Sequence, residues 1–225
     1  MVRSARLVLT FLVSLAAGRA AADAPPDPFK LYGNEMVFSV WRSGAEIGQH
    51  HVTFASENGA LVVKSLFDVV IRLLGVPVYR YKYQSAETWR DGKLDQLSST
   101  VDDDGTVSKV EAKEDNGKLA IAGPKTHEVA TLPLLPSTHW NAQVIAAVRL
   151  LNTLNGKVDQ VKLVPVGQET VPVGAAQRQA THYHYTGDIK AESWYDAEGH
   201  WLKLNFAGTD GTLIDYVCKS CMAPP

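Results

Sequence analysis

Dipeptides that close tight hairpins recur along the chain at intervals of about a dozen residues. They are Ser43-Gly44, Asn58-Gly59, Asp91-Gly92, Asp104-Gly105, Asn116-Gly117 and Asp210-Gly211. Such pairs tolerate positive φ angles, and the segments between them are rich in Val, Ile, Thr, Tyr and Phe. This rhythm predicts a mainly β protein, built as a curved antiparallel β-meander that forms a half-barrel or an open barrel.

Two long segments alternate apolar and polar residues. In 61–73 the odd positions form a nearly continuous apolar face, whereas the even positions include Lys64, Asp68 and Arg72. In 78–90 the odd positions carry Tyr79, Tyr81, Tyr83, Glu87 and Trp89. One-sided strands of this length favour a strongly curved sheet with one wet face over a flat sandwich.

One segment has the apolar spacing of a helix rather than a strand. Its apolar residues are Trp140, Val144, Ala147, Val148, Leu151 and Leu154. Ser137 or Thr138 can cap the N-terminus, and Asn155-Gly156 can end the helix. We therefore expect one amphipathic helix over about 137–154, packed on the concave face of the sheet. A helix that binds a partner is the alternative.

The N-terminus has the features of a secretory signal peptide over residues 1–22. Arg3 and Arg6 precede a short apolar run, and small residues follow it at 20–22. The run is shorter than the ~20 residues that span a bilayer, and no later segment is apolar enough to span. We expect a periplasmic or secreted protein with no membrane span after cleavage. An uncleaved anchor is the alternative.

The expected organisation has three parts after the signal peptide. These are a flexible Pro-rich segment over 23–34, a single β-meander domain over 35–217, and a short tail over 218–225 that holds a Cys-x-x-Cys pair. Without the arginines of the signal, 19 basic residues face 24 acidic ones. This mild acidity argues against a nucleic-acid partner or an anionic membrane surface as partner.

Cys218 and Cys221 are the only cysteines of the chain. An oxidising compartment would allow them to form a disulfide. A redox motif would need a helix after the first cysteine, and only four residues follow Cys221. Metal binding and intermolecular pairing also stay open.

Two segments echo each other: Glu87-x-Trp89-x-Asp91 and Glu192-x-Trp194-x-Asp196. The spacing places each glutamate and its tryptophan on one face of a strand. A carboxylate held against an aromatic surface would have a raised pKa and could act as an acid or base. Alternatively, each turn closes a hairpin and each glutamate makes a hydrogen bond or ion pair across the sheet. The candidate ligand-binding residues are Tyr79, Tyr81, Tyr83, Glu87, Trp89, Trp140 and Trp194.

His182 and His184 alternate along one expected strand, so both rings share a face and could ligate a metal. Two ligands do not make a site. A third would have to come from His50, His51, His200 or Glu192, depending on strand register. We therefore assign no metal and no cofactor. The sequence contains no nucleophile elbow, phosphate loop or dinucleotide fingerprint.

Several segments resemble an uncharacterised family of exported bacterial β-proteins, grouped as a domain of unknown function. The resembling segments are Phe38-Ser-Val-Trp-Arg-Ser-Gly44-Ala-Glu-Ile47-Gly48, Glu87-Thr-Trp89-Arg-Asp91-Gly92-Lys-Leu94, Ser137-Thr-His-Trp140-Asn141 and Trp194-Tyr195-Asp196. The resemblance spans roughly 36–217 and implies export and a β-meander, but no activity and no catalytic residues. A looser architectural analogy is to the half-barrel lipoprotein carriers of the periplasm, in which a curved sheet and a helix enclose an apolar groove.

These observations lead us to expect a non-enzymatic protein that binds an apolar or amphipathic, lipid-like ligand in its curved sheet. The aromatic face of 78–90, with Trp140 opposite, motivates this expectation. The first alternative is an envelope interaction or assembly module with a solid core and a protein partner. The second is an enzyme that uses Glu87 or Glu192 as acid or base.

Overall fold

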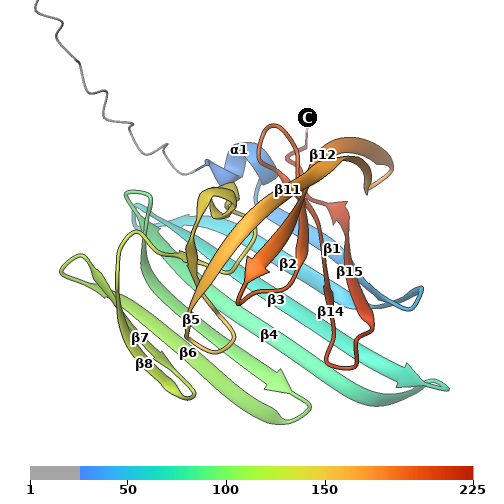
Figure 1. Ribbon diagram of the computed structural model, residues 1–225, viewed down its shortest axis with the longest axis horizontal. Coiled ribbons are helices and arrows are strands. Elements are labelled where there is room, and N and C mark those ends of the chain that lie inside the picture. Colours follow the sequence, from blue (N-terminus) through green and yellow to red (C-terminus); the bar gives the residue numbers. More distant parts are fainter. Residues whose placement is uncertain (1–25, 225) are drawn as a thin grey trace, which may run out of the picture.

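The computed structural model describes residues 26–224 (Figure 1). Its strands form one sheet of 15 strands, which confirms the predicted mainly β, curved antiparallel meander. The expected signal peptide, residues 1–22, lies outside the described residues. None of the helices in the described part of the chain is long and apolar enough to cross a membrane.

The first half of the chain is a continuous meander in which each strand pairs antiparallel with the next. Its strands are β1 (Glu35–Arg42), β2 (Ala45–Glu57), β3 (Ala60–Leu73), β4 (Val76–Arg90), β5 (Lys93–Asp103), β6 (Thr106–Asp115), β7 (Lys118–Gly123) and β8 (Thr126–Thr131). The predicted turn dipeptides close the hairpins at Ser43, Asn58, Asp91, Asp104 and Asn116, all of which have positive φ.

The second half adds strands on the other side of β1 (Figure 1). Its elements are β9 (Leu135–Pro136), the 3₁₀ helix η1 (Ala142–Ala146), β10 (Arg149–Leu151), β11 (Val158–Val173), β12 (Ala176–Gly187), β13 (Glu192–Tyr195), β14 (Trp201–Ala207) and β15 (Leu213–Ser220). The order across the sheet is β8 to β1, then β15 to β9. Of these neighbouring pairs, β9 and β10 run parallel.

The sheet curls so that its two ends approach each other. A Cβ atom added to Gly123, at the end of β7, would lie 2.3 Å from the carbonyl oxygen of Asn155, which precedes β11. The hydroxyl of Ser99, on β5, also donates to the carbonyl of Thr153, which precedes β11, at 2.5 Å. Only glycines allow the backbones to come this close, so the curl depends on Gly123 and Gly156.

The core lies on the inner face of this curled sheet. In β3 the buried side chains include Val63, Ser65, Phe67 and Val69, and the residues between them point to the other face. This agrees with the alternation expected for 61–73. The largest fully buried side chains include Tyr32, Trp140, Tyr185, Tyr195 and Trp201.

The predicted amphipathic helix over 137–154 is wrong. Only Ala142–Ala146 is helical, as a short 3₁₀ helix that Asn141 caps by accepting the amide of Gln143. The backbone becomes extended at Ala147, and Arg149–Leu151 pairs with β11. Val148 and Leu154, assigned to the apolar stripe, are 70% and 46% exposed. Strand pairing with β11 therefore overrides the local helical pattern.

Both ends of the described range also contain more regular structure than the sequence suggested. Within the expected flexible segment 23–34, Pro28–Tyr32 forms a short helix, α1, capped by Asp27. The hydroxyl of Tyr32 donates to the Trp140 carbonyl at 2.9 Å and accepts the Trp201 amide at 3.0 Å. At the other end, Cys218 belongs to β15 rather than to a tail. Pro28–Tyr32 and Cys218 are therefore both integrated with the core.

Candidate functional site

Glu87, on β4, is completely buried at the inner face of the sheet. Its Oε2 accepts the indole N–H groups of Trp89 at 2.8 Å and Trp140 at 3.2 Å. Its Oε1 accepts the hydroxyl of Thr138 at 2.8 Å. Burial raises the pKa of Glu87, and the three hydrogen bonds lower it by less. All three donors are uncharged, so the arrangement is a buried tie between β4 and the segment before η1.

The tyrosines of β4 do not share one environment. Tyr83 is buried, Tyr81 is half-buried against Phe67 with a centroid distance of 5.8 Å, and Tyr79 donates to Asp103 at 2.6 Å near the end of the strand. Burial raises the pKa of Tyr81 to about 12, with a further contribution from the charge of Asp103. The predicted aromatic face is therefore continuous from Tyr81 to Trp89, and Tyr79 lies at its exposed end.

His50, on β2, lies inside a group of aromatic rings. The ring centroids of Phe67, Trp201 and Tyr216 lie 6.0, 5.8 and 5.6 Å from the His50 ring, each in an edge-to-face arrangement. Phe67 and Tyr216 stack on each other at 5.5 Å. Burial lowers the pKa of His50 to about 3, and nearby His139 contributes further. The imidazole is therefore neutral at ordinary pH.

Polar atoms without partners gather around His50 on the inner face. Both ring nitrogens of His50 are buried with no hydrogen-bond partner, as are the hydroxyls of Ser65, Tyr83 and Ser85. Ser85 and Thr153 lie near the Tyr83 hydroxyl, but no contact meets hydrogen-bond geometry. Ser65 and Ser85 are cross-strand partners on β3 and β4. Phe67, on β3, is the cross-strand partner of both His50 on β2 and Tyr83 on β4. Native proteins leave few buried polar atoms unpaired, so this inner patch is unusual.

Sequence reasoning missed this patch. It considered His50 only as a metal ligand. A signal was present, because Gly48, His50, Val52 and Phe54 alternate with polar residues and place the histidine on the apolar face of its strand. Neither the aromatic neighbours from β14 and β15 nor the closeness of His139 could be read from that alternation. They depend on how the two halves of the sheet face each other.

Trp194 belongs to a separate cluster from Trp140. Its ring is covered by His182, which stacks at 4.2 Å, and by the ammonium group of Lys203, 4.7 Å from the ring centroid. Its indole N–H donates to Glu169 at 2.8 Å. The second copy of the Glu-x-Trp echo is thus bounded by charged groups, whereas the first is buried among apolar ones.

Glu192 does meet both histidines of β12. Its carboxylate oxygens lie 2.7 Å from Nε2 of His182 and 2.5 Å from Nδ1 of His184. The other nitrogen of His182 contacts Glu169 at 2.9 Å. Carboxylate oxygens thus occupy both ring nitrogens of His182 and one of His184, rather than leaving them to a metal.

A cluster of three titratable side chains lies in the turn before β14. Ligand-type atoms of Asp196, Glu198 and His200 lie within 4.8 Å of one another. The Asp196 carboxylate, however, accepts the backbone amides of Glu198 and His200 and contacts Nδ1 of His200 at 2.8 Å. These hydrogen bonds shape the turn.

Cys218 and Cys221 are joined by a disulfide and are both buried.

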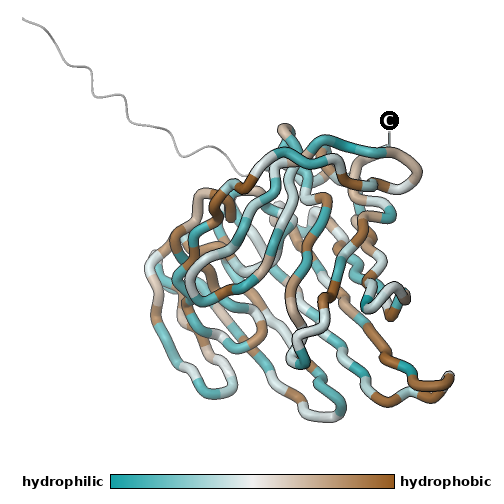
Figure 2. The backbone as a smooth tube through the Cα atoms, turned by 45° about the vertical axis from the view of Figure 1, so that its right-hand side comes forward, coloured by the Kyte–Doolittle hydropathy of each residue, from teal (hydrophilic) through white to brown (hydrophobic). Residues whose placement is uncertain are grey.

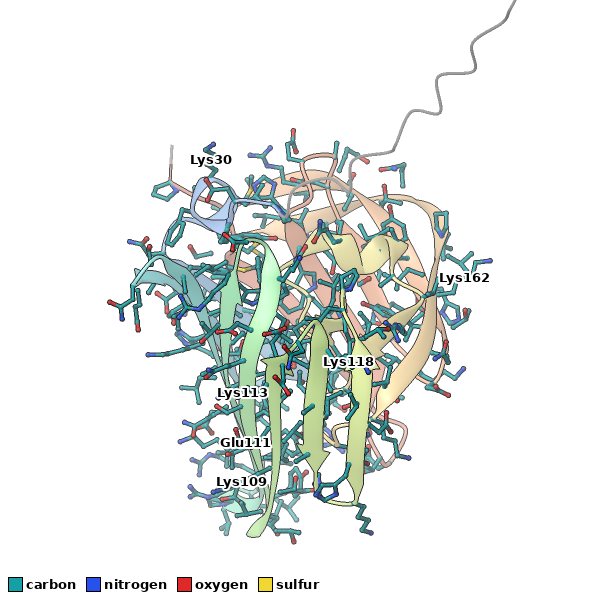
Figure 3. All side chains as sticks on the ribbon, turned by 90° about the vertical axis from the view of Figure 1, so that its left-hand side faces the viewer. Lys30, Lys109, Glu111, Lys113, Lys118 and Lys162 are labelled. Atoms are coloured by element: carbon teal, nitrogen blue, oxygen red, sulfur yellow. A yellow bond between two sulfur atoms is a disulfide. The ribbon has the colours of Figure 1, made fainter. Side chains whose placement is uncertain are left out.

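Grooves also occur on the outer face of the sheet. One of about 730 Å³ lies over β4 to β8, and its lining includes Gln96, Glu111, Lys113, His127 and Val129. Figure 3 shows Lys109, Glu111 and Lys113 along one side of β6. The lining mixes charged and amide groups with apolar ones, and the groove is open to solvent rather than an enclosed pocket.

The fold and the inner face define a curled, single-sheet protein of the β-barrel-like class. A solved β-barrel-like protein from Brucella abortus, of a domain of unknown function called DUF1849, is similar to it with a TM-score of 0.59 and 13% identity. The similarity covers 84% of this chain and 96% of that one, and it shows the fold alone.

The chain belongs to the family DUF6134, a domain of unknown function, whose profile matches residues 38–219. This confirms the resemblance to an uncharacterised β-protein family. No curated protein matches the chain significantly.

Proposed function

We propose that this protein is a non-enzymatic, exported binding protein that takes an amphipathic, lipid-like ligand at the inner aromatic face of its sheet. The observation that carries the proposal is His50, whose two buried ring nitrogens lack partners among aromatic rings. Export to the periplasm or beyond is supported by the basic and apolar pattern of residues 1–22.

The aromatic rings around His50 offer a surface for the apolar part of a ligand. Phe67 and Tyr216 form a stacked pair, which Tyr81 and Phe206 extend at 5.8 and 6.1 Å. Tyr81 and Phe206 are only half-buried, so this end of the cluster is open to an incoming molecule. Aromatic and aliphatic surface with a few placed polar groups is typical of small-molecule sites.

His50 also restricts the polar part of the ligand. A neutral imidazole has one N–H donor and one acceptor nitrogen, and the nearby serine and tyrosine hydroxyls can act as either. The unpartnered polar groups of this patch belong to uncharged side chains, and a low-dielectric environment disfavours an unpaired ion. The arrangement suits an uncharged polar group such as a hydroxyl, an ester or an amide.

The two alternatives have less support. An interaction module could use the outer groove over β4 to β8, but nothing there favours one partner. An enzyme would need a carboxylate aimed at a substrate. Glu87 is enclosed by Trp89, Trp140 and Thr138 without a histidine, and Glu192 is engaged by His182 and His184.

The proposal is tested by mass spectrometry of protein purified after export, under conditions that preserve noncovalent complexes. We expect a co-purifying lipid, or binding of added monoacylglycerol, to wild-type protein. His50→Phe should keep the aromatic surface but lose the polar contacts, and reduce the bound fraction about tenfold. His127→Phe, at the outer groove, is the matched control. Absence of any ligand from the wild type, or equal binding by His50→Phe, would overturn the proposal.

A further inference from the structure

The turn between β3 and β4 departs from the other tight hairpins of this protein. In residues 26–224, six non-glycine residues have positive φ, and each precedes a glycine in a hairpin turn. Five of them are Ser, Asn or Asp, which tolerate this left-handed conformation well. The sixth is Leu74, with φ 50°, followed by Gly75 with φ 84°. A leucine at this position is conformationally unfavourable.

Burial of the side chain does not offset the conformational cost at Leu74, because that side chain is 98% exposed. Its neighbours Leu73, Val76 and Val78 are 65%, 62% and 53% exposed. Figure 2 shows this apolar hairpin end projecting at the lower right, away from the body of the sheet. Four large apolar side chains within six residues are thus presented to solvent at a turn that an Asn-Gly pair would form more easily.

The apolar residues lie at the very end of the hairpin, where one cross-strand pair shares a face and one leucine stands at the apex. Leu73 and Val76 are cross-strand partners, Pro77 is paired with Arg72, and Leu74 stands at the apex. A groove on a protein would contact one side of such a ribbon. A lipid bilayer surface can take up the whole protruding end, apex included, and this exposed end with cations behind it is the reason to prefer a bilayer as the occupant.

Cationic side chains lie directly behind the tip. Arg72 donates to the Gly75 carbonyl at 3.3 Å, and Arg80 and Lys82 follow on β4. Within residues 26–224, no carboxylate lies in ion-pair distance of these three cations. Their charge complements the phosphates of lipid headgroups, although the chain as a whole is mildly acidic.

Of the acidic residues near these cations, Asp68 and Asp102 are the cross-strand partners of Lys82, and those of the β5–β6 turn accept hydrogen bonds from other groups. On the β5–β6 turn, Asp103 accepts the hydroxyl of Tyr79, Asp104 accepts the backbone amide of Arg80, and Asp102 accepts the amide of Gly105. Their side chains are thus held against the protein.

We propose that the β3–β4 tip docks on a lipid bilayer surface. Leu73, Leu74 and Val76 enter the boundary between headgroups and acyl chains, and Arg72 and Arg80 meet the phosphates. The inference is independent of the proposed function, because its residues lie at the tip and the His50 patch lies inside the sheet. Failure of one proposal leaves the other standing.

The test uses protein purified after export and vesicles of phosphatidylethanolamine and phosphatidylglycerol, in a flotation assay. Leu74→Asn gives this turn the Asn-Gly pair found at the other hairpins. It should therefore raise the thermal midpoint while weakening vesicle association about tenfold. This combination separates docking from damage to the fold. Val129→Asn, at an exposed valine of β8, is the control and should float like the wild type.

Two further measurements sharpen the test. Leu74→Asn combined with Val76→Asn should abolish flotation, and Arg72→Gln should weaken flotation more at low salt than at high salt. Wild-type protein that does not associate with vesicles would overturn the proposal. So would a Leu74→Asn protein that floats like the wild type. Self-association that depends on Leu74, without flotation, would assign the tip to a second copy of the chain instead.

Discussion

Glu87 and Trp140 are 53 residues apart in the sequence, yet the indole N–H of Trp140 donates to the Glu87 carboxylate at 3.2 Å in the core. Trp140 also packs edge-to-face against Trp89 at 5.5 Å. The segment before η1 is thus held to β4 by one acceptor that serves three donors. An acceptor at this position is needed because each buried donor would otherwise be unpaired.

Removal of this acceptor should destabilise the protein strongly. Glu87→Ala leaves the indoles of Trp89 and Trp140 and the hydroxyl of Thr138 without a partner, and we expect a loss of about 3 kcal/mol in the free energy of unfolding. Glu87→Gln keeps an amide oxygen for the indoles and should lose less than about 1 kcal/mol. Urea denaturation at pH 7 measures both. Equal losses of unfolding free energy for the two variants would contradict the role of Glu87 as the shared hydrogen-bond acceptor.

The same residue should give stability a pH dependence. The native pKa of Glu87 is raised above its ordinary value of 4.5 by burial. Above pH 4.5 the folded protein therefore keeps a proton that the unfolded chain has released, and stability falls as pH rises through the native pKa. Glu87→Gln has no such proton. We expect its stability to lack this decline, as measured by urea midpoints from pH 4 to 8.

His50 should contribute a dependence of the opposite sign. Its native pKa is lowered to about 3 from 6.5, so the unfolded chain binds a proton that the folded protein does not. Stability is therefore lost as pH falls from 6.5 toward 3. His139, with a pKa lowered to about 4 by burial, acts in the same direction. His50→Phe should be less sensitive to acid than the wild type, and the double variant with His139→Phe less still. Unchanged acid sensitivity in both would contradict the burial of these rings.

Gly48 should not tolerate a side chain. A Cβ atom there would lie 2.0 Å from the carbonyl oxygen of Asp68 on β3, and backbone cannot move aside as a flexible side chain can. We expect Gly48→Ala to lose about 3 kcal/mol or more. Gly44 has φ +78° with open space around it, so Gly44→Asn should change stability by less than about 1 kcal/mol. Thermal unfolding compares the two, and a Gly48→Ala protein as stable as Gly44→Asn would contradict the close approach.

The charged cluster over Trp194 should contribute little. Glu169 accepts the Trp194 indole and contacts His182, and its pKa is lowered mainly by the Trp194 hydrogen bond. A lowered pKa gives stability that is present above pH 4.5 and lost as pH falls. Because Glu169 is exposed, Glu169→Gln should lose only about 0.5 kcal/mol at pH 7, and the loss should shrink as the pH falls below 4.5. A loss that does not change with pH would assign the effect to packing.

The meander was predictable because its signals are local. Turn pairs such as Asn58-Gly59 and alternation such as that of 61–73 need no knowledge of distant strands. The order of the sheet was not predictable, because β15 joins β1 across nearly the whole chain. The helix prediction for 137–154 was wrong for the same reason. Its apolar spacing fits a helix, but Arg149–Leu151 is stabilised more by pairing with β11.

The candidate site was predicted in part. Tyr81, Tyr83, Glu87 and Trp89 follow one another on the inner face of β4, as their spacing indicated. The role of Glu87 as a buried tie, and the separation of Trp194 from Trp140, depend on which strand lies opposite. Strand register across the two halves is set by tertiary packing, and no pattern within one segment reports it.

The pairing of β1 with β15 has a consequence for how the polypeptide is completed. β1, the first of the described strands to be synthesised, has one of its two neighbours only when β15, the last of them, is available. The middle of the sheet is therefore closed by residues 213–220. A nonsense mutation that removes residues from 213 onward would open the molecule at its centre rather than trim an edge. Long-range closure of this kind slows folding, and newly made molecules stay exposed to proteases until the C-terminus arrives.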